Sequence, residues 1–296
     1  MTVHGFSPAH VRSLLQARAV GVPPAAESQD LAATLYSHWY AAPLAESRVD
    51  PAWPPLEGML RLAQGEALGW TPAIVIGHGA GGITVARAAD GRARALLRGS
   101  YTHQEGSERT GLPAQAGEHI MAVPRSGGVV SEGWWRSWGG GWDPRSAPKD
   151  VTRVYLGPAL WELPYLVGLL TVALETRSEP WMIKVLAQEH SLGRPDAMVI
   201  YVASTAAFGD IVECARGRVR TRPGPPLTEI LAPGVSWAQE PGDGCSFGES
   251  RCSLMAGILQ RTTNADDETF LGTASEEFLS AGLDPTAPHL RRRAHE

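Results

Sequence analysis

The sequence predicts an α+β fold in which a mixed sheet packs against helices and follows a helical N-terminal segment. Short apolar runs rich in Val, Ile and aromatic residues, which are typical of strands, occur in pairs within residues 73–97 and 151–202. Longer stretches with helical periodicity lie before residue 70 and after residue 205. We therefore expect a helical segment over residues 1–70 and an α+β core over residues 71–296. One continuous domain over residues 1–296 is the alternative.

The N-terminal segment is predicted to be helical in several places. The predicted helices are Ser7–Arg18, Asp30–Tyr40 and Leu56–Leu68. Ser7 is a suitable N-cap, and a proline suits the position that follows because its missing N–H would be unpaired there in any case.

A glycine-rich stretch at residues 77–82 follows a predicted strand at Ala73–Ile76. The glycine spacing matches a dinucleotide-binding fingerprint, but that fingerprint needs a helix directly after the glycines. Ile83–Ala88 and Arg92–Leu97 instead have the pattern of two strands around a tight turn. We therefore predict that the glycines serve a turn and that no dinucleotide site is present.

Two loops are predicted on either side of a strand at Glu118–Val123. The loop Gly99–Ala116 is polar and contains His103. The loop Ser126–Lys149 is rich in Gly, Trp and Ser, and loops of such length are usually functional lids or disordered linkers. Its tryptophans favour an ordered lid, a peptide-binding surface or a packed loop over disorder.

The second half alternates predicted strands and helices. Strands are expected at Val151–Leu156, Trp181–Leu186 and Ala197–Val202 and, as a pair, within Leu227–Trp237; helices are expected at Pro158–Arg177, Ala206–Arg220, from Ser246 onward and at Glu276–Leu283. Because side chains alternate along a strand, Arg153 and Tyr155 share one face of the first strand.

Lys184 lies inside the predicted strand Trp181–Leu186 and shares a face with Met182 and Leu186. An amine in such a position must find a partner, reach an edge or lose its charge. Arg194 and Asp196 follow at the mouth of the next strand. Two interpretations stay open: an active site with a buried amine beside an anion-binding arginine, or a lysine whose stem packs while its amine reaches solvent.

Arg251 lies one turn into a predicted helix at a position that is in phase with Leu254 and Met255. Ser246 and Glu249 form a capping-box pattern at the start of this helix. A helix N-terminus and a buried arginine both favour an anion, so a phosphate or carboxylate site and an internal ion pair are both consistent with the pattern.

Composition excludes several classes of protein. The chain has 26 basic and 31 acidic residues and a net charge of −5, which argues against non-specific nucleic-acid binding. Its 3 cysteines lack metal-binding spacing and fit a reducing cytoplasm better than a disulfide scaffold. The most apolar segment, Leu166–Leu174, is too short to span a membrane. We expect a cytoplasmic protein without a bound metal.

Several motifs follow one another in a characteristic order between about Val151 and Leu290. They are Arg153-Val-Tyr155, a long apolar helix, Ile183-Lys-Val-Leu186, Arg194-Pro-Asp196, Val199-Ile-Tyr-Val202, Leu231-Ala-Pro-Gly234, Ser246-Phe-Gly248 with Arg251, and Ala281-Gly-Leu-Asp284. In this order the chain resembles the HopA-type effector-like family, named for a bacterial type III secreted effector. Homologues of that family occur in gene clusters for ribosomally made peptides, including class V lanthipeptides.

The resemblance implies a lyase that eliminates phosphate from phosphoserine or phosphothreonine and leaves dehydroalanine or dehydrobutyrine. It implies a phosphorylated precursor peptide as substrate, a separate Ser/Thr peptide kinase and a cyclase as partners, and no cofactor. Elimination needs a base for the Cα proton and positive charge for the departing phosphate. Lys184 is the candidate base, and Arg153, Arg194 and Arg251 are the candidate phosphate-binding residues.

The remaining candidate roles are proton donation and orientation. Tyr155 and His103 are the candidate proton donors, while Asp196 and Tyr201 are candidates for orienting the site. We also expect Arg194 and Arg251 to converge on one pocket. The alternative function is a non-catalytic effector-like or peptide-presenting protein partnered with a kinase. Phosphatase or kinase activity is less favoured, since no Cys-x5-Arg loop and no convincing nucleotide motif is present.

Overall fold

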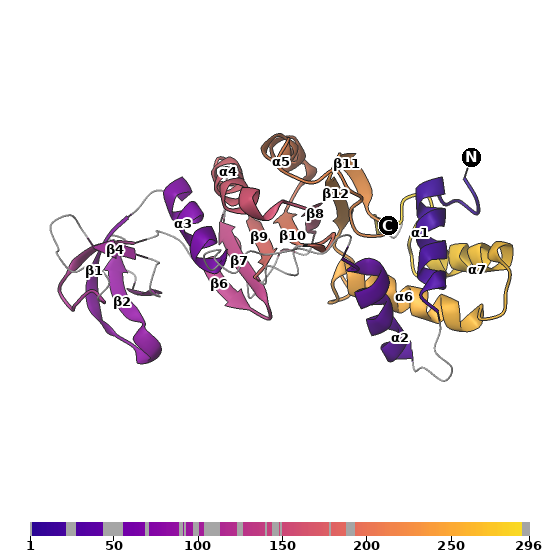
Figure 1. Cartoon of the computed structure of the whole chain (residues 1–296), viewed down its shortest axis with the longest axis horizontal. Coiled ribbons are helices and arrows are strands. Elements are labelled where there is room, and N and C mark those ends of the chain that lie inside the picture. Colours follow the sequence, from indigo (N-terminus) through magenta and orange to yellow (C-terminus); the bar gives the residue numbers. More distant parts are fainter. Residues whose placement is uncertain are drawn as a thin grey trace.

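The computed structural model describes residues 2–21, 28–43, 56–68, 71–88, 91, 93–96, 101–103, 113–122, 127–139, 141–143, 148, 150–177, 179–187 and 193–291. A small sheet, a larger sheet and a group of helices follow one another along the longest axis (Figure 1). Every described strand pairing is antiparallel, so the α+β class is confirmed and the expectation of a mixed sheet is wrong. Hairpins such as β1–β2 and β6–β7 explain the antiparallel sense, since a short turn can join only antiparallel neighbours.

The small sheet has the strand order β3-β2-β1-β5-β4. Its strands are β1 (Thr71–His78), β2 (Thr84–Ala88), β3 (Ala93–Leu96), β4 (Tyr101–His103) and β5 (His119–Ala122). The predicted glycine turn is confirmed, because the short 3-10 segment η2 (Ala80–Gly82) connects β1 directly to β2. Gly81 and Gly82 have φ values of 70° and 78°, which non-glycine residues rarely adopt.

The larger sheet has the strand order β11-β12-β8-β10-β9-β7-β6. Its strands are β6 (Gly127–Ser131), β7 (Trp134–Gly139), β8 (Thr152–Leu156), β9 (Trp181–Leu186), β10 (Met198–Val202), β11 (Glu229–Ala232) and β12 (Val235–Gln239). The predicted strands around Arg153 and Lys184 are therefore confirmed, and they are neighbours of the central strand β10.

The expectation of a long loop at Ser126–Lys149 is wrong over β6 and β7, which form a hairpin. Glu132 and Gly133 turn the chain with φ values of 53° and 76°, as in a two-residue hairpin turn. Along β7 burial alternates, with Trp135 completely buried between half-buried neighbours. This period of two was hidden by the high Gly and Trp content, which is more typical of loops.

One face of the larger sheet is covered by α4 (Leu163–Glu175) and α5 (Phe208–Ala215), with α3 (Leu56–Leu68) packed on α4. The apolar core under these helices includes Val154, Ile183 and Ile200. The short 3-10 segments η3 (Leu160–Glu162) and η5 (Thr205–Ala207) lead into α4 and α5. Figure 1 shows α4 and α5 together on one side of the sheet.

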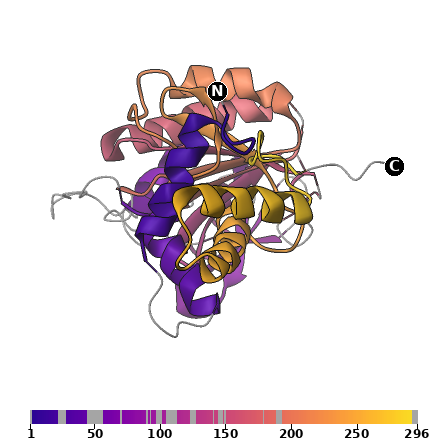
Figure 2. The same cartoon turned by 90° about the vertical axis from the view of Figure 1, so that its right-hand side faces the viewer.

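The opposite face is covered by helices from the two ends of the chain. They are α1 (Pro8–Ala19), α2 (Ser28–Leu35), the π-helical segment η1 (Tyr36–Tyr40), α6 (Phe247–Arg261) and α7 (Asp267–Ser280). Figure 2 shows these N- and C-terminal helices crossing one another in front of the sheet. None of the helices in the described part of the chain is long and apolar enough to cross a lipid bilayer.

The helix ends show which predicted caps and helix lengths agree with the structure. Ser7 caps α1 by accepting a hydrogen bond from the His10 N–H, as predicted. The expected helix over Ala206–Arg220 instead ends at Ala215, because Gly217 turns the chain with φ 71°. Glu276–Leu283 contains only the end of the longer helix α7, whose N-cap is Asp266.

Candidate active site

Strand register gathers charged and aromatic side chains on the sheet face that is covered by α2 and α6. Residues directly opposite one another in antiparallel strands point to the same side. Lys184 lies opposite Arg136 of β7 on one side and Val199 of β10 on the other, and Val199 lies opposite Tyr155 of β8. The next row on this face consists of Trp138, Met182, Tyr201 and Arg153. The sheet itself therefore brings Lys184, Arg153, Tyr155 and Tyr201 together.

The amine of Lys184 is half-buried and lies against the Trp134 ring, with Nζ 4.1 Å from the ring centroid. Within the described residues, no hydrogen bond or ion pair reaches this amine. Burial, followed by the positive charges of Arg136 and Arg153, lowers the pKa of Lys184 to about 8, although the negative charges of Asp196 and Glu132 act in the opposite direction. A neutral amine is thus accessible close to physiological pH, as a general base requires.

Arg153 lies on this face, where its side chain is buried and forms an ion pair. Its Nε and Nη2 donate to the two carboxylate oxygens of Glu240, and its guanidinium lies 4.9 Å from the centroid of the Tyr201 ring. Tyr201 also packs against Trp142 at 6.0 Å between ring centroids, and burial raises its pKa.

Arg194 and Asp196 form a two-point ion pair at the edge of the same site. Arg194 Nε donates to Oδ1 of Asp196 at 2.8 Å, and Nη2 donates to Oδ2 at 2.7 Å. The guanidinium carbon lies 5.7 Å from the Tyr36 ring centroid and 5.8 Å from that of Trp134. Asp196, which is only 3% exposed, therefore orients Arg194 toward the indole that also carries Lys184.

Arg222 fixes the segment that carries this ion pair. Its Nη1 donates to the carbonyl of Gly193 at 2.9 Å, and its Nη2 donates to the carbonyl of Arg194 at 2.8 Å. The guanidinium can approach because Gly157 has no side chain; a Cβ there would lie 2.5 Å from Arg222 Nε.

Two tyrosines that sequence reasoning did not include line the site from η1. Tyr36 and Tyr40 stack at 5.4 Å, and the Tyr40 and Tyr155 hydroxyls lie 3.3 Å apart. Arg194 Nη2 donates to the Tyr36 hydroxyl at 3.4 Å, and burial is the main cause that raises the pKa of Tyr36 to about 12. Burial also raises the pKa of Tyr155 far above its ordinary value. The i, i+4 spacing of Tyr36 and Tyr40 at a helix end was the signal in the sequence that could have indicated their shared position. π-Helical turns such as η1 often occur at functional sites.

The N-terminus of α6 also reaches the site. The Ser246–Glu249 capping box is present as predicted, and its hydrogen bonds, together with Arg153 and Lys184, lower the pKa of Glu249. Gly248 lets η1 approach closely, because a Cβ there would lie 2.4 Å from Tyr40 and 2.8 Å from Tyr36.

Arg251 has the buried position that its helical phase predicted, but its guanidinium is used elsewhere. Nε and Nη2 donate to the Pro288 carbonyl at 3.2 and 3.0 Å, and the guanidinium lies 4.6 Å from the Phe247 ring centroid. Burial lowers the pKa of Arg251 to about 10. Among its described hydrogen-bond partners none is shared with Arg194, so the two arginines are not brought together by direct contacts.

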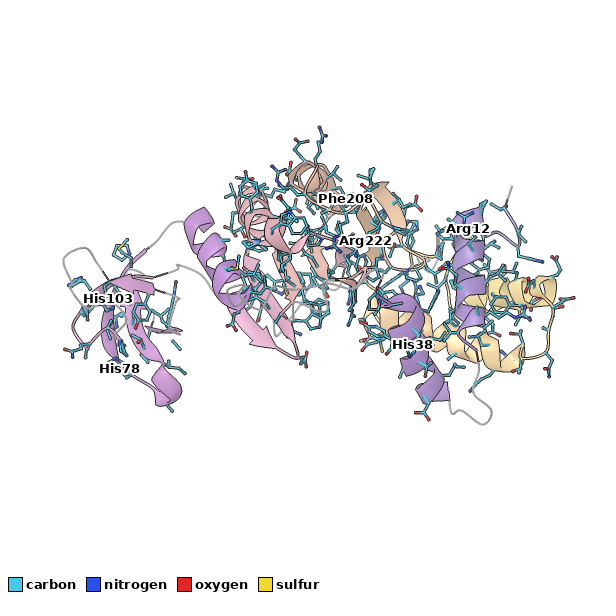
Figure 3. The ribbon with its side chains drawn as sticks, in the orientation of Figure 1. Arg12, His38, His78, His103, Phe208 and Arg222 are labelled. Atoms are coloured by element: carbon cyan, nitrogen blue, oxygen red, sulfur yellow. The ribbon has the colours of Figure 1, made fainter. Side chains whose placement is uncertain are left out.

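His103 lies on β4 of the small sheet, where Nδ1 is 2.5 Å from Oε1 of Glu118. Figure 3 shows His103 with the small sheet, away from Arg222 in the part formed by the larger sheet. The structure therefore does not place His103 beside Lys184. No group of His, Cys, Asp and Glu side chains within the described ranges is arranged to hold a metal ion.

Comparisons with known proteins agree with this architecture. A family model described as the HopA1 effector protein family matches residues 131–290, which include β7 and everything from β8 to α7. The effector protein from Pseudomonas syringae pv. tomato strain DC3000 has a similar fold, with a TM-score of 0.57, 15% identity, and coverage of 96% of this chain and 98% of that chain. The effector protein from Pseudomonas syringae pv. syringae strain 61 gives a TM-score of 0.55 at 12% identity, with 96% of each chain covered. At these identities the two likenesses show the fold alone. No curated protein matches the sequence.

Proposed function

The chain belongs to the HopA1 effector protein family, and from this premise we propose that it is a phosphoserine/phosphothreonine lyase acting on a ribosomally made precursor peptide in lanthipeptide-type biosynthesis. In this reaction a base takes the Cα proton, the C–H electrons form the Cα=Cβ double bond, and the Cβ–O bond breaks with loss of phosphate. The product residue is dehydroalanine or dehydrobutyrine. A separate kinase would supply the substrate, and a cyclase would consume the product.

The single observation that carries the proposal is the position of the Lys184 amine, which is half-buried against Trp134 and near Arg136 and Arg153 and therefore has a lowered pKa. With a pKa of about 8, about a tenth of its amines are neutral at pH 7, against less than about a thousandth for an ordinary lysine. The amine lies on a sheet face with Arg136 and Arg153, and Arg194 shares its indole neighbour. A base with nearby positive charge is what proton abstraction beside a dianionic leaving group needs.

Arg194 is the proposed principal phosphate ligand, with support from Arg153. Each uses its Nε and Nη2 on a carboxylate, and no described residue accepts a hydrogen bond from either Nη1 group. The Nη1 donors are therefore the ones we assign to phosphate oxygens. Arg251 is not part of this proposed set, since its Nε and Nη2 donate to the Pro288 carbonyl and its Nη1 donates to the Ser250 hydroxyl.

Tyr36 is the proposed proton donor to the departing oxygen. Tyr155 is proposed to hold it in place indirectly, because its hydroxyl contacts that of Tyr40, whose ring stacks on Tyr36. Tyr36 accepts a hydrogen bond from Arg194, so its own O–H stays available to donate. Its raised pKa keeps the hydroxyl protonated throughout the physiological range.

A specific observation favours a second candidate, a non-catalytic protein that binds or presents a peptide. Both Arg153 and Arg194 are already paired with internal carboxylates, which is typical of residues that hold a structure together. Such a protein would bind the phosphopeptide and leave it unchanged.

Mass spectrometry of a phosphothreonine peptide and a phosphoserine peptide incubated with the protein distinguishes these functions. A lyase gives a product that has lost phosphoric acid and that reacts with an added thiol. A phosphatase gives the unphosphorylated serine or threonine peptide, which is heavier than the lyase product by one water. A binding protein leaves the mass of the phosphopeptide unchanged. The Lys184→Met variant is the matched control, because it keeps an unbranched stem of similar length but has no amine.

A further inference from the structure

The small sheet presents an apolar groove that the proposed reaction does not use. The groove has a volume of about 340 Å³ and is lined by Pro72, Ala73, Ile74, Ile76, Arg87, Ala88 and His119. Ile74 and Ile76 are 42% and 41% exposed, which is unusual for two large apolar side chains on one strand of a small sheet. The sheet has its own buried core on the other face, around Val75, Ala86 and Ile120. The groove is therefore an additional apolar surface that faces solvent.

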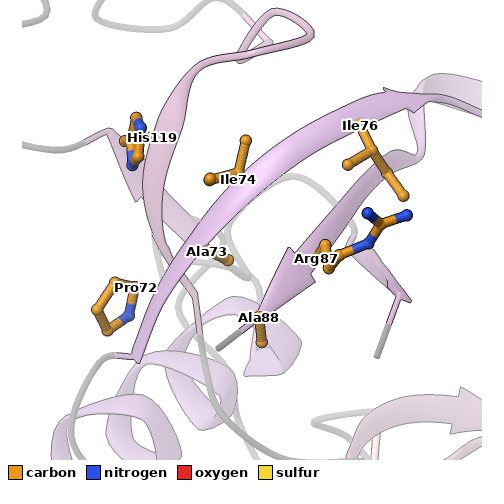
Figure 4. A pocket seen from close by; sticks show the side chains of 7 residues that line it. All are labelled: Pro72, Ala73, Ile74, Ile76, Arg87, Ala88 and His119. Carbon is orange, nitrogen blue, oxygen red and sulfur yellow. The ribbon is translucent and has the colours of Figure 1, made fainter. Parts of the chain in front are cut away.

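An arginine and a histidine flank this apolar floor. Ile74 of β1 lies opposite Arg87 of β2 and opposite His119 of β5, so all three side chains are on the same face. Figure 4 shows Ile74 and Ile76 along β1 with His119 and Arg87 on either side. Among the residues that the structure describes, none forms an ion pair with Arg87 or His119, and no carboxylate lines the groove.

This chemistry fits an extended peptide that carries apolar and acidic side chains. The volume accommodates a few side chains, as an extended peptide laid along the groove would supply. Apolar side chains would cover Ile74 and Ile76, and carboxylates would pair with Arg87 and, when it is protonated, with His119. Residues 71–122 have 5 basic and 4 acidic residues, a net charge of +1, whereas the remainder of the chain carries −6 (−5 − 1). The acidic excess of the protein therefore lies outside this sheet and would not repel such a peptide from the groove.

We propose that the groove of Ile74, Ile76, Arg87 and His119 binds an unphosphorylated, acidic and apolar segment of the substrate peptide, away from the residue that loses phosphate. This inference rests on the proposed function. The groove and Lys184 lie on different sheets, so one extended peptide would have to occupy both places (Figure 1). Binding energy from a remote segment is a general way to select one peptide when the reacting residue is small and common.

Fluorescence anisotropy with a fluorescein-labelled, unphosphorylated peptide of alternating Leu and Glu tests the proposal. We expect the full chain to bind this probe and to bind a peptide of alternating Leu and Lys at least tenfold more weakly. Ile74→Ser and Arg87→Glu should each weaken binding of the Leu–Glu probe at least tenfold. Ile230→Ser and Arg12→Glu are the matched controls: Ile230 is 66% exposed and Arg12 is exposed, neither lines the groove, and both variants should bind like the unchanged protein.

The outcomes separate this proposal from the proposed function. Loss of probe binding in Ile74→Ser and Arg87→Glu, with unchanged kcat on a short phosphopeptide, supports the groove and the lyase together. The same loss of binding without any elimination by the unchanged protein supports the groove and removes the lyase. Equal probe binding by the groove variants and their controls overturns the groove, whatever the activity. A dimer that dissociates on Ile74→Ser, measured by light scattering, would overturn it in favour of a second copy of the chain.

Discussion

Lys184 and Arg194 lie against the same indole ring: Nζ of Lys184 is 4.1 Å from the centroid of Trp134, and the guanidinium carbon of Arg194 is 5.8 Å from it. The two cations come from different segments, one from β9 and one from the turn before β10. Trp134 reaches them because β7 pairs with β9. An aromatic face attracts both cations and keeps two groups close that would otherwise repel each other.

Trp134 should therefore matter for catalysis although it cannot itself transfer a proton. Replacing Trp134 with Leu should lower kcat/KM about 2- to 30-fold, which corresponds to the ~0.5–2 kcal/mol of a partly desolvated cation–π contact. Trp134→Phe should retain more activity, because it keeps an aromatic face. Steady-state kinetics on a phosphothreonine peptide would check this, and equal rates for the Leu and Phe variants would remove the aromatic contact from the account.

The pH dependence of elimination should reflect Lys184. Its folded-state pKa is lowered to about 8, so the fraction of neutral amine rises with pH and levels off above that value. We expect kcat/KM to increase about tenfold per pH unit below pH 7 and to reach a plateau above about pH 9. The substrate phosphate also titrates near pH 6. The inhibition constant of a phosphonate-containing competitor, measured over the same pH range, should therefore be used to separate the ionisation of the phosphate from that of Lys184. A rate that is independent of pH between 6 and 9 would contradict the assignment.

Gly248 should be intolerant of a side chain. A Cβ there would lie 2.4 Å from Tyr40, so Gly248→Ala must displace η1 and should cost about 1–3 kcal/mol of unfolding free energy. Gly257 is the matched control in the same helix, because a Cβ there meets only the end of the Arg261 side chain at 3.6 Å. Gly257→Ala should be neutral or stabilise by up to about 1 kcal/mol through helix propensity. Urea unfolding of both variants measures the difference, and similar losses in both would contradict the packing argument.

His289 should make the protein sensitive to acid. Burial, His10 and Arg251 lower the pKa of His289 to about 4, despite Glu229 at 3.9 Å. The unfolded state binds a proton below about pH 6.5 and the folded state only near pH 4, so stability is lost as the pH falls through this window. The loss from this residue should be on the order of 2–3 kcal/mol.

Thermal unfolding of His289→Phe between pH 7 and pH 4 checks that expectation. The variant should lose less stability over this range than the unchanged protein. The exposed His38 is the control, and His38→Gln should leave the pH dependence as it is. A His289→Phe variant with an unchanged pH profile would show that His289 is not the sensitive group.

The sequence was sufficient for the α+β class and for the strand that contains Lys184, because a short run of Val, Ile and aromatic residues has few alternative conformations. The capping box at Ser246 and the buried phase of Arg251 were also predictable, since both are set within a few residues along the helix. The partner of Arg251 was not predictable, because Pro288 approaches from a distant part of the chain.

The remaining part of the site depended on contacts between distant segments. Trp134 and Arg136 were assigned to a loop, so their positions beside Lys184 became clear only from the β7–β9 register. Tyr36 and Tyr40 reach the site because η1 packs on Gly248. His103 was a candidate on its chemistry alone, and the structure places it on the small sheet instead.

The most direct test of the central claim is phosphate release by Lys184→Arg at saturating phosphopeptide. Arginine keeps the charge and most of the volume but does not deprotonate at physiological pH. We predict that the variant folds, still binds the phosphopeptide and loses elimination by about 10²- to 10⁴-fold, the usual contribution of a general base. Turnover close to that of the unchanged protein would contradict the account and remove Lys184 from the mechanism.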